Sequence, residues 1–139
     1  MTLIELTVVV FLISLIFTLA VPSFSHLLES RIKSDAKRLA SVLRHLDETA
    51  VSSKKTLSVD IDLDKRLVRY FTTEGQRTER FDSIRAVELQ TKGRLSSGAV
   101  TVFFSPAGAT EALWFYLNDE KKELTVSFNP LSGRVAVSE

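Results

Sequence analysis

The chain has 139 residues, 45% of them hydrophobic and 25% charged, with no cysteine and a formal net charge of +1. These numbers exclude a disulfide framework, a thiol nucleophile and a thiolate metal site, and a charge so close to zero does not argue for a nucleic-acid-binding protein. All 18 basic residues and 16 of the 17 acidic residues follow Pro22. The composition therefore predicts an apolar segment over residues 1–22 and a globular domain over residues 23–139, large enough to form its own core.

The first predicted element is a membrane-spanning helix. Residues 3–21 form a 19-residue apolar run, close to the roughly 20 residues that cross a bilayer core. Its hydroxyl side chains, those of Thr7, Ser14 and Thr18, can bond to backbone carbonyls and so do not oppose insertion. A cleavable secretory signal would need a basic start, whereas this segment has the acid Glu5. An ordinary signal anchor leaves Glu5 unexplained, since an acid in a membrane segment is costly and usually marks a function.

A third interpretation explains Glu5. Residues 1–6, Met-Thr-Leu-Ile-Glu-Leu, followed by the apolar run and Pro22, resemble the mature N-terminus of type IV pilins and type II secretion pseudopilins. The resemblance implies that a prepilin peptidase removes a leader and that Met1, where Phe is usual, is the processed, N-methylated residue. It also implies that Thr2 and Glu5 act in subunit assembly, Glu5 pairing with the terminal amine of another subunit. Both charges are costly in an apolar medium, so such a pair would set the register; alternatively, Glu5 only marks the membrane edge.

The second half of the helix is predicted to be amphipathic. Pro22 lies within a helical pattern and predicts a kink or local melting. Beyond it, over about residues 23–53, apolar residues recur every three or four positions and predict one face packed on the head. The fold class expected is α+β, with one long helix ending near Ser53 and a β-rich head. The apolar stripe consists of Phe24, Leu28, Ile32, Ala36, Leu39, Leu43, Leu46 and Ala50.

After Ser53 the hydrophobic period changes to two, which predicts a β-sheet domain over about residues 55–139. The first two strands should form a hairpin through residues 62–65. Alternation does not say which of Trp114, Phe115 and Tyr116 face the core. The predicted strands are residues 56–62, 66–72, 84–90, 99–105, 112–118, 123–129 and 134–138.

Two turns in the last third carry a second resemblance. Residues 103–108, Phe-Phe-Ser-Pro-Ala-Gly, and residues 131–135, Leu-Ser-Gly-Arg-Val, are similar to turns of the GspH/FimT group of minor pilin-like proteins, with Ser132 where Thr is usual. They are also ordinary hairpin turns. FimT-like DNA binders have a second arginine in a Gly-Arg-x-Arg motif, where this chain has Ala136. Residues 99–139 carry net charge −2, so Arg134 is a DNA contact only in the alternative function, and residues 65–94, with eight bases and four acids, are the rival DNA surface.

No chemistry of an enzyme is recognised in the sequence. His26 and His45 lie on the helix, and His45 with Asp47 and Glu48 is expected to be solvated charge rather than a metal or catalytic site. Residues 118–120 suggest calcium, which the major pseudopilins bind, but a polar hairpin tip is the preferred interpretation. No nucleophile elbow, P-loop or dinucleotide fingerprint occurs. We therefore expect no cofactor, no metal and no enzymatic activity, although an unknown active site in a membrane-anchored enzyme stays open.

The resemblance implies a structural function. The leading hypothesis is an H-type minor pseudopilin of a type II secretion system, and the alternative is a FimT-like minor type IV pilin in pilus assembly or DNA uptake. Expected partners are other pilin-like subunits, the prepilin peptidase, inner-membrane lipid before assembly and an assembly platform; nucleic acid is not expected. The chain should cross the bacterial inner membrane once with its head in the periplasm, and then enter a pseudopilus or pilus.

Overall fold

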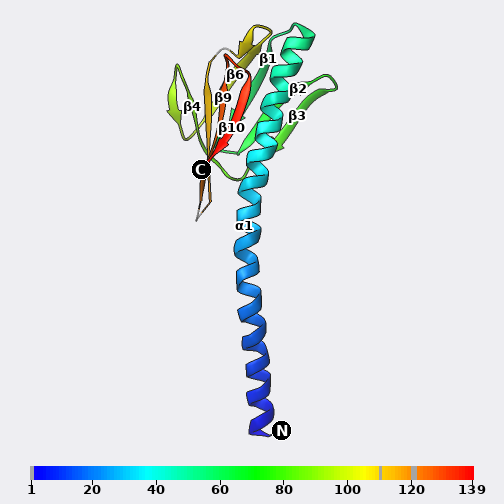
Figure 1. The fold of residues 1–139 in the computed structure, drawn as a ribbon, viewed down its shortest axis with the longest axis vertical. Helices are drawn as coiled ribbons and strands as arrows, with labels where there is room; N and C mark the ends of the chain where they lie inside the picture. Colours follow the sequence, from blue (N-terminus) through cyan, green and yellow to red (C-terminus); the bar gives the residue numbers. More distant parts are fainter. Residues whose placement is uncertain (1, 110, 120–121) are drawn as a thin grey trace.

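A single helix, α1 (Leu3–Ser53), accounts for more than a third of the chain. The computed structural model describes residues 2–109, 111–119 and 122–139, and for residues 21–30 and 108–109 it describes the backbone alone. The helix continues through Pro22, and the kink expected there stays a prediction. Its first half extends alone from the head, whereas its second half lies along the head (Figure 1).

The helix ends where side chains compete for its last carbonyls. Ser53 Oγ donates to the Thr49 carbonyl at 2.6 Å, and Ser52 Oγ donates to the same carbonyl at 3.3 Å. Lys54 then adopts a left-handed conformation (φ 54°), which turns the chain towards the first strand.

The described part of the head contains two antiparallel sheets, with strand orders β3-β2-β1-β6-β7 and β10-β9-β8-β4-β5. The predicted hairpin is confirmed, with Asp62 of β1 opposite Leu67 of β2. The seven predicted strands are all present, and the patterns missed three short or polar ones, β3, β5 and β7. The strands are β1 (Leu57–Asp62), β2 (Leu67–Thr72), β3 (Gly75–Arg80), β4 (Ile84–Leu89), β5 (Gly93–Leu95), β6 (Ala99–Ser105), β7 (Gly108–Ala109), β8 (Leu113–Asn118), β9 (Glu123–Asn129) and β10 (Arg134–Ser138).

The core lies between α1 and the two sheets, which confirms the α+β class. The rings of Phe104 on β6 and Phe128 on β9 meet edge to face, 5.3 Å apart, and so join the two sheets. Each fully buried Leu or Ile contributes on the order of 2 kcal/mol, so the helix is part of the head's own core rather than a tether to it. The described part of the predicted stripe is at most 1% exposed: Ile32, Ala36, Leu39, Leu43, Leu46 and Ala50.

Candidate functional site

The free half of α1 presents a continuous apolar surface. Residues Leu3–Ala20 are long and apolar enough to cross a membrane, and none of this segment is buried in the structure. Its 13 large apolar side chains, from Leu3 to Leu19, are 47–84% exposed on all sides of the helix. A soluble monomer rarely leaves so large an apolar patch in water, and a helix that is apolar all round belongs in a membrane or a protein core. This surface therefore requires a cover of lipid or other helices.

Three hydroxyl groups in this segment are satisfied within the helix. Thr7, Ser14 and Thr18 each donate a 2.8 Å hydrogen bond to the carbonyl four residues earlier. An unpaired hydroxyl in hydrocarbon would cost several kcal/mol, about 4–8 on a cyclohexane scale. The predicted bonds from these side chains to backbone carbonyls are thus confirmed, and insertion of the segment into a membrane stays a prediction.

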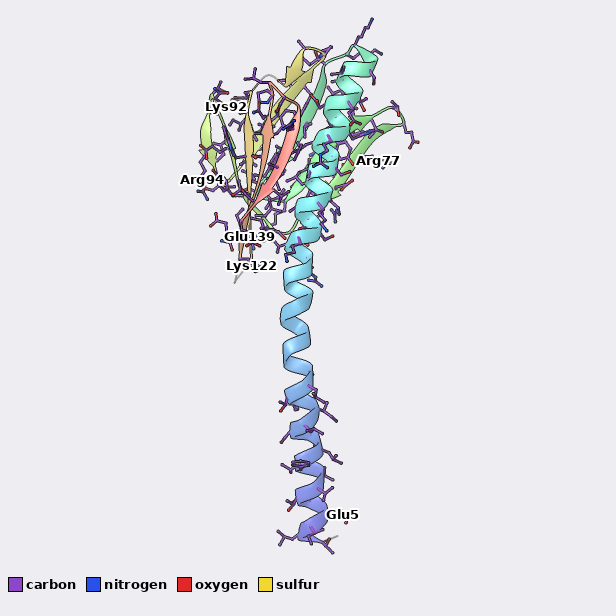
Figure 2. All side chains as sticks on the ribbon, in the orientation of Figure 1. Glu5, Arg77, Lys92, Arg94, Lys122 and Glu139 are labelled. Atoms are coloured by element: carbon purple, nitrogen blue, oxygen red, sulfur yellow. The ribbon has the colours of Figure 1, made fainter. Side chains whose placement is uncertain are left out.

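The start of the helix is capped by Thr2, one of the two residues that the resemblance assigns to subunit assembly. The Glu5 backbone N–H donates to Thr2 Oγ1 at 3.3 Å, and Thr2 has the extended backbone (φ −107°, ψ 158°) of an N-cap residue. Glu5 lies in the first turn, where the helix dipole favours a negative charge. Figure 2 places Glu5 at the end of the helix farthest from the head. Met1 lies outside the described residues, so the pairing of Glu5 with a terminal amine stays a prediction.

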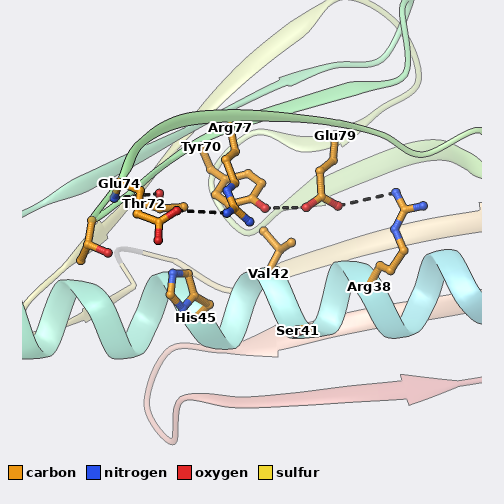
Figure 3. A pocket seen from close by; sticks show the side chains of 10 residues that line it. Arg38, Ser41, Val42, His45, Tyr70, Thr72, Glu74, Arg77 and Glu79 are labelled. Carbon is orange, nitrogen blue, oxygen red and sulfur yellow. Dashed lines mark hydrogen bonds and ion pairs between the residues drawn. The ribbon is translucent and has the colours of Figure 1, made fainter.

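A polar cleft of about 340 Å³ separates α1 from the β2–β3 hairpin (Figure 3). The Tyr70 hydroxyl donates to Glu79 at 2.6 Å, and Arg38 on the helix lies 3.6 Å from the same carboxylate. At the tip of the hairpin, Arg77 of β3 pairs with Glu74 of the preceding turn at 3.3 Å. Burial, followed by the hydrogen bond to Glu79, raises the pKa of Tyr70 to about 12. These groups satisfy one another, so the cleft fastens the hairpin to the helix rather than presenting an activated group.

The structure separates the predicted His45–Asp47–Glu48 cluster. His45 lines the cleft beside the hairpin, whereas Asp47 lies against the turn between β9 and β10. Burial, and then the charge of Glu48, raises the pKa of Asp47. The His26 side chain lies outside the described residues. Among the described residues, no group of three His, Cys, Asp or Glu side chains is placed to hold a metal ion.

The predicted polar tip between β8 and β9 is held by Asp119. Its Oδ1 accepts the Lys122 N–H at 2.8 Å, and its own N–H donates to the Lys122 carbonyl at 3.0 Å. Asn118 bonds through its N–H to the Ser83 carbonyl at 2.9 Å, and Glu120 lies outside the described residues. The carboxylate of Asp119 therefore closes a turn, which favours the hairpin interpretation over a calcium site.

The candidate DNA contacts lie on separate surfaces. Arg134 is exposed at the start of β10, opposite Asn129. Within residues 65–94, Arg94 stacks over the Tyr116 ring at 4.2 Å and Arg77 lies on the distant hairpin. Other arginines of this stretch gather at the foot of the head, around Asp82. The basic composition of residues 65–94 was visible in the sequence, but only the topology brings these arginines together with those of α1.

Comparison with known proteins shows which solved structures have a similar fold. No protein-family model matches the chain, and no curated protein matches it in sequence. Two crystal structures of the type IV minor pilin FimU from Pseudomonas aeruginosa PAO1 are similar to it, with TM-scores of 0.53 and 0.55 at 16% identity. They cover 77% and 80% of this chain, and 92% and 90% of their own. At this identity, the likeness is one of fold.

Proposed function

We propose that this chain, which has a type IV pilin-like fold, is a structural subunit that assembles into a membrane-anchored filament through its N-terminal helix. One observation supports the proposal most directly: the first half of the helix is apolar and exposed, whereas the second half of the same helix forms part of the core of a folded head. Before assembly, lipid would cover the apolar half, and after assembly the helices of neighbouring subunits would replace that lipid. The head would then project from a bundle of helices, with the membrane segment single-pass and the head in the periplasm.

Glu5 is the residue that would specify this packing. It is the only side-chain charge in the apolar segment, and an unpaired carboxylate in an apolar medium is unfavourable by several kcal/mol or more. A terminal amine on a neighbouring helix would neutralise it, and a shift of register would leave both charges unpaired. Thr2 would act beside it by fixing the first turn, from which the carboxylate projects.

Within this class, the finer assignment is an H-type minor pseudopilin of a type II secretion system. It is supported by the GspH/FimT-like turns, by Ala136 in place of a second arginine, and by the net negative charge of residues 99–139. A minor type IV pilin is the second candidate, and the likeness to FimU favours it. Deleting the gene separates the two candidates. Retention of secreted proteins in the periplasm supports the pseudopilin, whereas loss of surface pili with normal secretion supports the pilin.

The assembly role is tested by replacing Glu5. Glu5→Ala should insert into the membrane normally but lose co-purification with its partner subunits, and Glu5→Asp should retain part of it because the charge is kept at shorter reach. Glu48→Ala is the matched control, since it removes an exposed acid from the head half of the same helix. Co-purification of Glu5→Ala at the wild-type yield would contradict the charge-pair role.

A further inference from the structure

Five arginines surround a cavity of about 380 Å³ at the foot of the head. Two come from α1, and the others come from the turn before β2, the end of β3 and the start of β4. The carboxylates that face them are Asp35, Asp82 and Asp119 in the cavity lining, and Glu79 beside it; Arg38 lies 3.7 Å from Asp35 and 3.6 Å from Glu79, so five arginines face four carboxylates. The arginines are Arg31, Arg38, Arg66, Arg80 and Arg85.

The cluster is held in place by the backbone of residues 80–82. Arg66 and Arg85 each donate one hydrogen bond, at 3.1 Å, to the Asp82 carbonyl. Arg80 Nε lies 2.7 Å from the Asp82 carboxylate, and Arg38 donates to the Arg80 carbonyl at 2.8 Å. A guanidinium has five N–H donors, and these contacts use a minority of them. The remaining donors stay available in a preorganised group, the arrangement that suits a phosphate.

Acidic residues near the cluster are engaged in the fold. Asp35 accepts two hydrogen bonds from Ser83, at 3.2 Å from its N–H and 2.8 Å from its hydroxyl. The hydrogen bond and charge of Arg80, with further contributions from Arg66 and Arg31, keep the pKa of Asp82 low. Asp82 is therefore a fixed anion that organises the arginines, and it neutralises only part of their charge.

The cluster lies at the end of the head that faces the apolar half of α1, the end marked by Lys122 and Glu139 in Figure 2. From Ala20 to Arg31 the helix rises about 16 Å, at roughly 1.5 Å per residue. If residues 3–20 fill a bilayer core of about 30 Å, the headgroups extend to within roughly 7 Å of the Arg31 backbone. Side chains on a helix lean towards its N-terminus, so Arg31 reaches towards that layer. The gap is about one Debye length at physiological salt.

We propose that this arginine cavity binds the phosphate of an anionic phospholipid and so seats the head on the membrane surface before assembly. The inference rests on the proposed membrane anchoring of α1 but not on filament formation. A lipid fits the site because the helix that supplies Arg31 and Arg38 continues into the membrane segment. The phosphates of DNA or free phosphate share the chemistry, but neither is brought to this end of the head by its position.

The test uses the full chain in zwitterionic detergent micelles, titrated with phosphatidylglycerol or phosphatidylcholine, with bound lipid counted by native mass spectrometry. Acyl chains bind the apolar helix equally from both lipids, so the difference isolates the headgroup. We expect phosphatidylglycerol to bind about tenfold or more tightly, the gain typical of a charge-assisted contact. The triple variant Arg31→Gln/Arg66→Gln/Arg85→Gln should lose this preference. Arg31→Gln alone, at a side chain exposed to solvent, should weaken it without disturbing the fold.

The matched control Arg69→Gln/Arg77→Gln/Lys92→Gln removes three exposed cations elsewhere on the head and should keep the preference. Equal binding of the two lipids to the wild-type chain would overturn the proposal, as would an equal loss in the control variant. Inorganic phosphate or duplex DNA, added at the same phosphate concentration, should not displace the lipid. Displacement by either would overturn the lipid assignment in favour of that phosphate source. Because the assay uses the unassembled chain, its result is independent of the Glu5 experiment.

Discussion

Replacing Gly133 with alanine should destabilise the head through two separable effects. Gly133 has a φ of +63°, and an alanine in this left-handed region costs about 1–2 kcal/mol. An added Cβ would lie 2.8 Å from Asp47 Oδ2, closer than such atoms approach, so the helix side chain or the turn must move. Because the contact falls on the end of a flexible side chain that can rotate away, it adds about 1 kcal/mol or less, the low end of overpacking costs, which brings the expected total to roughly 1–3 kcal/mol.

The contact part of this loss can be isolated with Asp47→Ala. In that background, Gly133→Ala should cost only the backbone part, about 1–2 kcal/mol. Urea unfolding of residues 25–139, followed by circular dichroism, gives the four free energies of unfolding for the cycle. An equal cost in both backgrounds would refute the contact between Asp47 and the turn. A cost below about 0.5 kcal/mol in the wild-type background would refute the conformational argument as well.

Four further outcomes are expected. A fragment of residues 25–139 should be soluble and folded by circular dichroism, because it contains the whole of the described buried stripe, from Ile32 to Ala50. Aggregation at every salt and pH tried would show that the head lacks its own core. The same fragment should give no DNA mobility shift at micromolar concentration and near-physiological salt, whereas a salt-sensitive shift abolished by Arg134→Ala would favour DNA uptake. Since the folded-state pKa of Asp47 is raised, its contribution to stability should be lost as pH rises from 3.8 through that pKa, so in pH-dependent urea unfolding the free energy of unfolding of the wild type should fall relative to that of Asp47→Asn. Tyr70 should ionise near pH 12 in an absorbance titration, so its contribution to stability should be complete below pH 10 and lost as pH rises through 12. A normal pKa for Tyr70, or a Tyr70 pKa that is not lowered by Glu79→Gln, would contradict the hydrogen bond.

The apolar stripe of the helix and the first hairpin could be predicted from the sequence because both produce local patterns of hydrophobic residues. Ile32, Leu39 and Leu46 recur at helical spacing, and the alternation of β1 and β2 has one buried face. Strand β3 (Gly75–Arg80) was missed because neither of its faces is fully buried, so its residues show no hydrophobic period. Alternation also cannot say which strands pair, and so the division into two sheets was not predictable.

The candidate functional residues also fall into one that the sequence identified and a group that it did not identify as a site. Glu5 was identified by its chemistry, as an acid among apolar residues, and its role remains a prediction because it depends on another subunit. The arginine cavity was only partly visible in the sequence, because the basic stretch of residues 65–94 contains three of its arginines but does not show that they meet the two on α1. Arg31, Arg66 and Arg85 are far apart in the sequence, and the ends of several strands bring them to one end of the head.

The continuity of α1 has a mechanical consequence. One 51-residue helix, about 76 Å long, is both the proposed anchor and part of the core, so a pull on the head would be carried along the helix axis by backbone hydrogen bonds. Extracting the helix would require its buried stripe, from Ile32 to Ala50, to slide past both sheets at once. Such loading is in shear, where the contacts share the force instead of breaking one after another. The head should therefore stay attached under tension, and any compliance should concentrate below it, around Pro22.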